Sequence, residues 1–278
     1  MMNTIQAGFV QLAPALGDTE ATMERLEALA DQFAAADLVV LPELCNSGYN
    51  FESPEQAWEL SETVADSVFL TFVRDLCAKN NQHIVTGFCE RDGDRLYNSS
   101  ALVGPNGSVG IYRKLHLFMN EKDIFEPGDV GLPVFEIGEL KVGMLICFDW
   151  VFPEAWRILA LRGADIICHP SNLVIPEKAQ RAVPIHAMIN GVYVATANRI
   201  GTERELTFTG GSLIAGPRSQ VLAQAPANSE AIEIVNIDIA AARNKAVTAR
   251  NDLLADRRPQ EYDFILEDQV RESTTQCK

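Results

Sequence analysis

The 278-residue sequence predicts a layered α/β fold with mixed sheets, and three observations lead to this prediction. Short apolar runs such as residues 37–41 contain β-branched residues, as strands buried on both faces do. These runs alternate with longer stretches whose apolar residues recur at helical spacing. The middle of the chain carries the turn dipeptides Asp92-Gly93 and Asn106-Gly107, which are typical of hairpins between antiparallel strands.

The chain begins with a predicted strand, helix and second strand. Residues 5–12 are rich in apolar residues and predict the first strand. Asp18 or Thr19 can cap the helix that follows, whose apolar face consists of Met23, Leu26, Ala30 and Phe33. The buried run at 37–41 is the second strand, and it places Glu43 just beyond a strand's carboxyl end.

The central part continues the alternation of helices and strands. A second amphipathic helix is predicted from Val64, Val68, Phe72 and Leu76, and a strand follows at residues 83–88. Residues 141–146 form another apolar strand that ends at Cys147. Pro153 suits the first turn of a helix and Gly163 suits its exit, so Cys147 is expected at a strand-to-helix junction.

The last third returns to strands after one more helix. Residues 165–168 and 192–198 predict strands on either side of a helix around 184–190. Three further strands are then expected at 206–215, 220–224 and 231–237. No linker composition divides the chain, so we expect one domain over residues 1–260, followed by a tail at 261–278 that is an intersubunit arm or disordered.

Charge and composition restrict the partners. The formal net charge of -15 disfavours nucleic acid, and no apolar run reaches the ~18 to 20 residues of a membrane span. The six cysteines form no CxxC pair and the first residues do not resemble a signal peptide, so a reducing cytoplasm is expected. The sequence also lacks phosphate-binding, dinucleotide-binding and zinc-protease motifs, and we therefore expect neither a cofactor nor a metal.

Three segments place reactive side chains directly after apolar runs. They carry Glu43, Lys114 and Cys147, within LPEL (41–44), YRKLH (112–116) and GMLICFD (143–149). Taken singly, a cysteine is usually a small buried hydrophobe, and a lone Glu or Lys is usually solvated. Because the ends of several strands can meet at one edge of a sheet, the three together predict a single site.

The same segments resemble the signature segments of the nitrilase superfamily, the carbon–nitrogen hydrolases. The resemblance extends over nearly the whole chain, through VQLAP, LPELCNSGYNF, YRKLHLF, CFDWVFPE, ADIICHPSNL, TANRIG and FTGGSLIAGP. It is strongest to small prokaryotic members. It implies a four-layer αββα sandwich that commonly pairs as a homodimer or a higher homo-oligomer.

The resemblance also implies roles for individual residues. Cys147 would be the nucleophile, Glu43 the general base and acid, and Lys114 the stabiliser of the oxyanion together with the backbone N–H of Phe148. Glu121 aligns with a second glutamate that positions substrate or catalytic groups. This assignment is chemically sensible, because a thiolate needs a nearby base or cation to form.

The substrate remains open between several possibilities. Tyr49, Phe118, Trp150 and Asn172 lie beside the signature segments and could line a narrow pocket, although core packing explains the aromatic residues equally well. Cys147 is followed by Phe-Asp rather than the Trp-Glu of many nitrilases, which favours a small amide or carbamoyl amide. A small nitrile is the alternative substrate, water is the co-substrate, and a non-catalytic interaction protein is the alternative class. A Cys–His hydrolase is the rival mechanism, with His116 and His169 as its nearest candidates.

Overall fold

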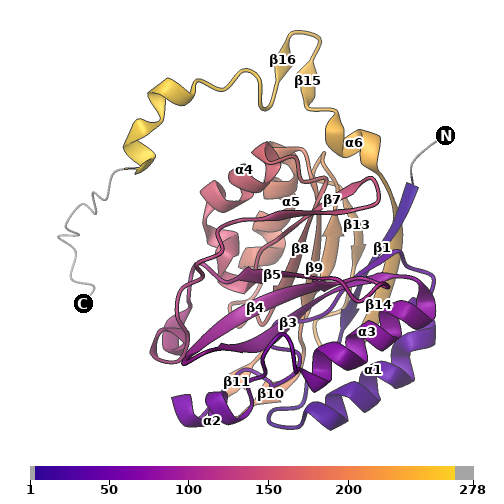
Figure 1. Ribbon diagram of the computed structural model, residues 1–278. Helices are drawn as coiled ribbons and strands as arrows, with labels where there is room; N and C mark the ends of the chain where they lie inside the picture. The colour runs from indigo at the N-terminus through magenta and orange to yellow at the C-terminus, as the bar shows by residue number, and fades with distance from the viewer. Residues whose placement is uncertain (1–3, 267–278) are drawn as a thin grey trace. The chain divides into compact units, whose positions relative to one another are not determined.

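The computed structural model describes residues 4–266 (Figure 1). The chain divides into a large compact unit that ends at Asn244 and a small one that begins at Lys245. The domain that we expect over residues 1–260 includes residues of both units, and its boundary stays a prediction. The small unit contains a hairpin and two short 3-10 helices, β15 (Ala246–Thr248), β16 (Asn251–Asp252), η3 (Pro259–Glu261) and η4 (Asp263–Leu266). Residues 267–278 of the predicted tail lie outside the described residues.

The first sheet of the large unit has six strands in the order β14-β1-β2-β3-β4-β5. Strands β1, β2 and β3 are parallel to one another. Strand β14 is antiparallel to β1, β4 is antiparallel to β3, and β5 is antiparallel to β4. The strands are β1 (Thr4–Gln11), β2 (Leu38–Val40), β3 (His83–Asp92), β4 (Arg95–Val103), β5 (Val109–Arg113) and β14 (Ala231–Asp238).

The second sheet also has six strands, in the order β13-β12-β9-β8-β7-β6. Strands β7, β8 and β9 are parallel, and the remaining pairs are antiparallel. Both sheets are therefore mixed, as the sequence predicted. The strands are β6 (Val134–Ile137), β7 (Leu140–Met144), β8 (Ile166–Ser171), β9 (Tyr193–Asn198), β12 (Leu213–Ala215) and β13 (Val221–Gln224).

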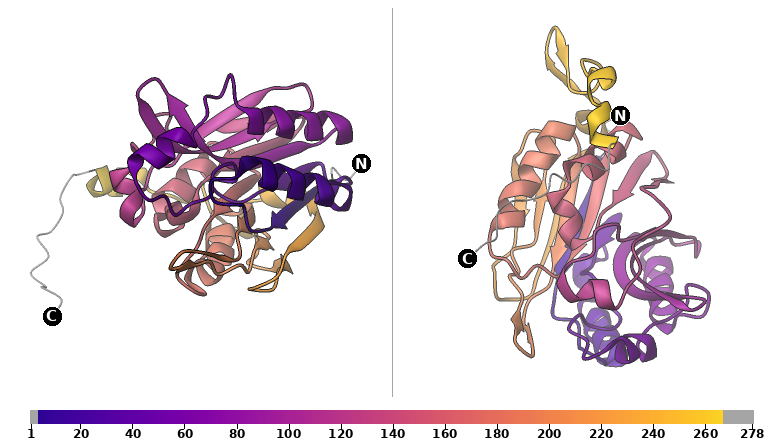
Figure 2. Two further views of the ribbon diagram at one scale, coloured as in Figure 1. Left: turned by 90° about the horizontal axis from the view of Figure 1, so that it is seen from below. Right: turned by 90° about the vertical axis from the view of Figure 1, so that its left-hand side faces the viewer.

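Helices cover the outer faces of both sheets, which confirms the four-layer αββα arrangement (Figure 2). On one side Leu26, Phe33 and Phe69 pack against Val10 and Val39 of the first sheet. On the other side apolar residues of two helices join the core that also fills the space between the sheets. The covering helices are α1 (Thr19–Phe33) and α3 (Val68–Asn80), then α4 (Pro153–Leu161) and α5 (Lys178–Asn190).

The helix boundaries follow the capping residues. Asp18 caps α1 as predicted, because its carboxylate accepts a hydrogen bond from the Ala21 N–H at 2.9 Å. Ser67 caps α3 by accepting from the Leu70 N–H at 2.8 Å, so this helix begins at Val68. Val64, which we assigned to that helix, lies outside it but packs against the same core.

One predicted strand was wrong in extent, and some short elements were missed. Residues 206–215 do not form a single strand, because Gly210 and Gly211 adopt φ values of 52° and 64° and interrupt it. The missed helices have six and five residues, too few for a helical period to be visible. These differences concern β10 (Thr202–Glu203), β11 (Leu206–Thr207), α2 (Pro54–Glu59) and α6 (Ile239–Arg243).

The strand directions bring the reactive segments to neighbouring sheet edges. Because β5 is antiparallel to β4 and β4 to β3, β5 runs in the same direction as β2. Glu43 after β2 and Lys114 after β5 therefore lie at the same edge of the first sheet. Cys147 after β7 and Asn172 after β8 lie at the carboxyl edge of the second sheet, because those strands are parallel. A hydrogen bond of 3.0 Å from Asn172 Nδ2 to the Glu43 carbonyl joins the two edges.

Candidate active site

Glu43 is fully buried, and its backbone lies directly on the neighbouring strand β3. The Gly87 N–H donates to the Pro42 carbonyl at 3.0 Å, and the Cys45 N–H donates to the Gly87 carbonyl at 3.0 Å. A Cβ at position 87 would lie 2.4 Å from the Glu43 Cα and 2.5 Å from the Leu44 N. Only glycine fits there, so the bare backbone of β3 determines the position of Glu43.

Lys114 is buried among carboxylates. Its N–H donates to the Asn98 carbonyl at 2.8 Å, which continues the pairing of β5 with β4 by one residue. The ammonium group is 2.7 Å from Glu43 Oε1 and 2.8 Å from Glu121 Oε1. Burial opposes the charged form of Lys114, but both carboxylates favour it, and the net result is a pKa raised above the usual value. Lys114 is therefore an ammonium ion.

Glu121 belongs to the 3-10 helix η1 (Met119–Asp123) and is also buried. Besides Lys114, its Oε1 accepts a hydrogen bond from the Tyr49 hydroxyl at 2.8 Å, and its Oε2 accepts from the Phe118 N–H at 3.1 Å. Burial raises the pKa of Glu121, and the charge of Lys114 opposes that shift. One cation thus bridges two carboxylates in a site with almost no access to water.

The two oxygens of Glu43 differ in their surroundings. Oε1 accepts hydrogen bonds from Lys114 Nζ and from Asn98 Nδ2, both at 2.7 Å. Oε2 is buried and has no hydrogen-bond partner among residues 4–266. An unsatisfied buried carboxylate oxygen is unfavourable, so Oε2 is available to accept a hydrogen from a group that enters the site.

Cys147 is 4% exposed and begins the 3-10 helix η2 (Cys147–Val151). Its φ of 40° lies in the left-handed region, where a residue other than glycine is strained. Burial raises the pKa of the Cys147 thiol well above its usual value, and the charge of Glu43 raises it further. The charge of Lys114 and the Asn172 N–H lower it. The resting residue is therefore a thiol that responds to both charges.

His169 supports the strained cysteine from behind. Its Nε2 donates to the Cys147 carbonyl at 2.9 Å, and its Nδ1 lies 3.1 Å from the Thr196 hydroxyl. Burial lowers the pKa of His169 to about 4, although the hydrogen bond to Cys147 opposes this. The imidazole is neutral, and its contact is with the cysteine carbonyl rather than with the sulfur. This arrangement does not support a Cys–His pair.

His169 should make stability depend on pH. Its folded pKa of about 4 lies below the usual 6.5, so between these values only the unfolded chain takes up the proton. We expect the contribution of His169 to be complete above pH 6.5 and to fall by about 3 kcal/mol as the pH decreases to 4. Urea unfolding of the wild type and of His169→Gln should show the difference in unfolding free energy shrinking over that window. An unchanged difference would contradict a buried neutral His169.

A small cavity opens beside Cys147. It has about 30 Å³ of free volume, room for only a few atoms, and Phe118, Phe148, Trp150 and Asn172 line it together with Cys147 and residues 173–175. Three of the four residues predicted to line a pocket are therefore in its wall. Tyr49 is not among the lining residues and hydrogen-bonds to Glu121 instead. Asn172 is 1% exposed, and its Oδ1 finds no partner within the described part of the chain.

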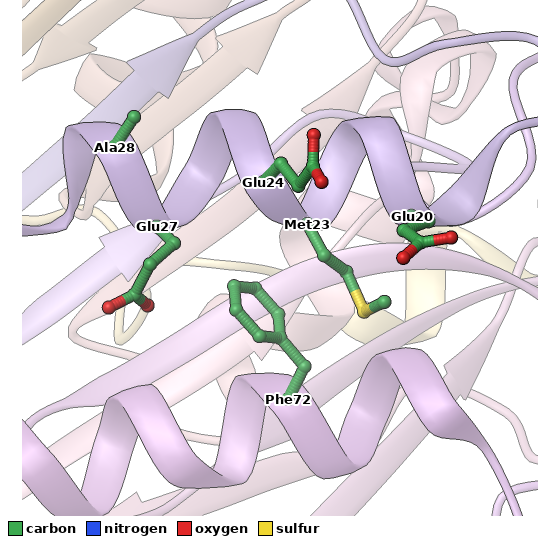
Figure 3. Close-up of a pocket in the computed structure, with 6 residues that line it drawn as sticks. All are labelled: Glu20, Met23, Glu24, Glu27, Ala28 and Phe72. Atoms are coloured by element: carbon green, nitrogen blue, oxygen red, sulfur yellow. The ribbon is translucent and has the colours of Figure 1, made fainter.

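A larger and more open depression lies between α1 and α3 (Figure 3). Met23 and Phe72 lie side by side there, and the carboxylates of Glu20, Glu24 and Glu27 border them. Its lining contains neither a thiol nor a cation. The small cavity at Cys147 is the better candidate for a reaction, because it contains a nucleophile close to an ion cluster.

Some residues of the site were missed at the sequence level. Asn98 lies in the middle of β4 and contacts Glu43 across 55 positions in sequence, so no local pattern marks it. Asp149 stood next to a predicted site residue, but its partners belong to the Lys114 segment.

A family model, two relatives and one solved structure are similar to this chain, and their descriptions agree with one another. The family model described as "Carbon-nitrogen hydrolase" matches residues 6–246. A protein named nitrilase from Pyrococcus abyssi is 46% identical over 260 residues, covering 93% of this chain and 99% of its own length. An (R)-stereoselective amidase from Pseudomonas sp. is 34% identical over 253 residues, covering 90% of each chain. A carbon-nitrogen hydrolase structure from Helicobacter pylori G27 superposes with a TM-score of 0.85 at 28% identity, covering 96% of this chain and 100% of that one.

Proposed function

The chain belongs to the carbon–nitrogen hydrolase family, the nitrilase superfamily, and from this premise we propose that it hydrolyses a small primary amide to an acid and ammonia through a Cys147 thioester. It is a hydrolase of carbon–nitrogen bonds by family, as the sequence predicted. The observation that carries the proposal is the buried cluster around Cys147, in which Glu43 keeps one oxygen without a partner among the described residues.

The first step moves a proton from sulfur to carboxylate. Burial raises the pKa of Cys147, so the thiol ionises only when a base receives its proton. Glu43 Oε2 is that base, because Oε1 is already engaged by Lys114 and Asn98. The thiolate sulfur then bonds to the amide carbon, and the carbonyl oxygen becomes an oxyanion.

Lys114 and the backbone N–H of Phe148 stabilise this oxyanion in the proposal. The ammonium is already fixed by two carboxylates, so little reorganisation is needed as negative charge develops. Glu121 accepts a second hydrogen bond from Lys114 and accepts one from the Tyr49 hydroxyl. We assign Glu121 and Tyr49 to positioning.

The remaining steps return the site to its starting state. The proton on Glu43 transfers to the amide nitrogen, the carbon–nitrogen bond breaks, and ammonia leaves a Cys147 thioester. Glu43 then removes a proton from water, whose oxygen bonds to the thioester carbon. The carbon–sulfur bond breaks, the acid departs, and the sulfur regains a proton. One carboxylate thus alternates between base and acid, a role that typically contributes about 10² to 10⁴-fold to the rate.

The hydrogen-bonding capacity of the site favours an amide over a nitrile. A primary amide nitrogen carries two hydrogens, and the site offers two buried acceptors, Glu43 Oε2 and Asn172 Oδ1, that have no partner in residues 4–266. A nitrile nitrogen carries no hydrogen and would leave both acceptors unsatisfied. Each unsatisfied acceptor costs about 1–3 kcal/mol, so the amide should be the better substrate.

A matched substrate panel tests this preference. Ammonia release is measured with acetamide, propionamide, the corresponding nitriles and N-carbamoyl amines. We expect each amide to exceed its nitrile in kcat/KM by at least about 10-fold, and Asn172→Ala to narrow the difference. Equal or faster hydrolysis of the nitriles would instead support nitrilase activity, the second candidate, which the name of the Pyrococcus abyssi relative favours.

We also assign a homodimer and a cytoplasmic location within this proposal. Apolar side chains are exposed on adjoining helices, Ile158 and Leu161 on α4 and Ile185 and Met188 on α5, and a second copy would cover them. A monomer by light scattering would contradict the dimer.

None of the helices within residues 4–266 has the length and apolar character needed to cross a bilayer. The support for a reducing compartment is that Cys45, Cys77, Cys89, Cys147 and Cys168 are free thiols. Secretion of a tagged chain would contradict it.

A further inference from the structure

Asp149 is a fully buried carboxylate, two residues after Cys147, and the reaction steps do not use it. Its Oδ2 accepts hydrogen bonds from the Tyr112 hydroxyl at 2.7 Å and from the Ile146 N–H at 2.9 Å. Its Oδ1 accepts from the His116 N–H at 3.2 Å and lies 2.7 Å from His116 Nδ1. Both oxygens therefore have partners, in contrast to Glu43, whose Oε2 has none among residues 4–266.

These partners belong to the segments that carry Cys147 and Lys114, whose side chains act together in the proposed reaction. Ile146 directly precedes Cys147, whereas Tyr112 and His116 lie two residues before and two residues after Lys114. One carboxylate thus joins the start of η2 to both sides of the lysine. The two segments are 33 to 37 positions apart in sequence. The Cys147 segment follows β7 of the second sheet, whereas the Lys114 segment includes the end of β5 of the first sheet.

Further contacts strengthen the junction. The His116 ring stacks on Phe152 at the end of η2, with centroids 3.5 Å apart and an interplanar angle of 8°. The Tyr112 hydroxyl also accepts a hydrogen bond from the Leu115 N–H at 3.3 Å. This bond joins the residues before and after Lys114. Burial and the charge of Asp149 raise the pKa of Tyr112 well above its usual value, which keeps the hydroxyl protonated as a donor.

We infer that Asp149 is a positioning residue that keeps the Cys147 turn in register with Lys114, with the Tyr112 hydroxyl and His116 as its two attachments. The inference rests on the roles proposed above for Cys147 and Lys114. The strained φ of Cys147 has to be held by its surroundings. Asp149 binds the N–H of the preceding residue, Ile146, and His169 binds the carbonyl of Cys147 itself. A displacement of about 1 Å between reacting groups can reduce a rate about 10²-fold.

Tyr112→Phe is the informative variant, because it removes one oxygen atom and preserves the buried ring. We expect kcat to fall about 10-fold or more with KM changed less than about 3-fold, since the defect lies in alignment rather than in substrate contact. In Asp149→Asn, kcat should fall about 10²-fold. Adding Tyr112→Phe to this variant should lower kcat by less than about 3-fold further, because both substitutions act through one carboxylate.

Tyr193→Phe is the matched control. Tyr193 is 5% exposed and lies at the start of β9, and its hydroxyl accepts a hydrogen bond from the Asp238 N–H at 3.2 Å, so the same atom is lost from a buried tyrosine outside both segments. Its kcat should stay within about 2-fold of the wild type, as expected of a substitution away from the reacting groups. The thermal unfolding temperature of each variant shows whether a loss of kcat reflects lower stability alone.

A substrate-independent measurement separates this inference from the proposed function. The rate of Cys147 alkylation by iodoacetamide, followed by mass spectrometry across pH, reports how well Lys114 stabilises the thiolate. Tyr112→Phe should slow alkylation and shift its profile to higher pH, whereas Tyr193→Phe should not. An unchanged alkylation profile and kcat in Tyr112→Phe would overturn the positioning role while leaving the proposed function intact. If the wild type hydrolyses none of the amides, the alkylation profile alone decides the inference.

Discussion

Replacement of Cys147 by alanine should reduce ammonia release to the background rate. The thiol is the nucleophile of the proposed mechanism, and loss of a hydrolase nucleophile typically lowers kcat on the order of 10⁶-fold. The variant should remain folded, because alanine removes a single buried sulfur atom from a small cavity. Ammonia release from the best amide of the panel, measured beside the thermal unfolding temperature, tests both expectations.

Cys77→Ala provides the matched control. Cys77 is a fully buried free cysteine on the outer helix α3, and its sulfur donates to the Val103 carbonyl at 3.4 Å. The same chemical change there should lower stability by about 1–3 kcal/mol and leave kcat unaltered. Amide hydrolysis that survives in Cys147→Ala, or that disappears equally in Cys77→Ala, would refute the thioester mechanism.

Glu43→Gln should have the second largest effect. Glutamine has the same shape, and its oxygen can keep the hydrogen bonds from Lys114 Nζ and Asn98 Nδ2. Its amide nitrogen, however, cannot take a proton from sulfur or return one to the leaving ammonia. We expect kcat to fall about 10² to 10⁴-fold, the usual contribution of a general acid and base.

Lys114 keeps one carboxylate partner in the Glu43→Gln variant. In Glu43→Gln the ammonium of Lys114 still faces Glu121 at 2.8 Å, so no buried cation loses all its partners and the fold should persist. A rapid-quench experiment should show no burst of ammonia, since acylation itself is impaired. A variant that forms the thioester at the wild-type rate but fails to release the acid would restrict Glu43 to the second half of the reaction.

Much of the fold could be predicted because its elements carry local signals. The buried run before Glu43 and the apolar run before Cys147 are strands that end just ahead of those residues, at Val40 and Met144. Their meeting at one site did not follow from the same signals, because β2 and β7 belong to different sheets. Even the capping of α1 by Asp18 was readable from one side chain.

The contacts of the supporting residues could not be predicted, not even for His169, which the sequence offered as a rival base, because these contacts are not local. Asn98, Tyr112 and His169 are ordinary strand or strand-end residues whose partners lie 55, 37 and 22 positions away. Only the folded register brings them to Glu43, Asp149 and the Cys147 carbonyl. No sequence pattern reveals that Glu43 Oε2 has no hydrogen-bond partner within residues 4–266, because this depends on how its neighbours are arranged in the fold.

The bare backbone beneath Glu43 limits how such a site can be redesigned. Since any side chain at position 87 would overlap the Glu43 Cα, that position is closed to substitution, and variation aimed at new substrates has to be directed elsewhere. The wall formed by Phe118, Phe148 and Trp150 is the part open to change. Laboratory libraries that randomise the aromatic wall and keep Gly87 constant would enlarge the range of acceptable acyl groups without disturbing the carboxylate.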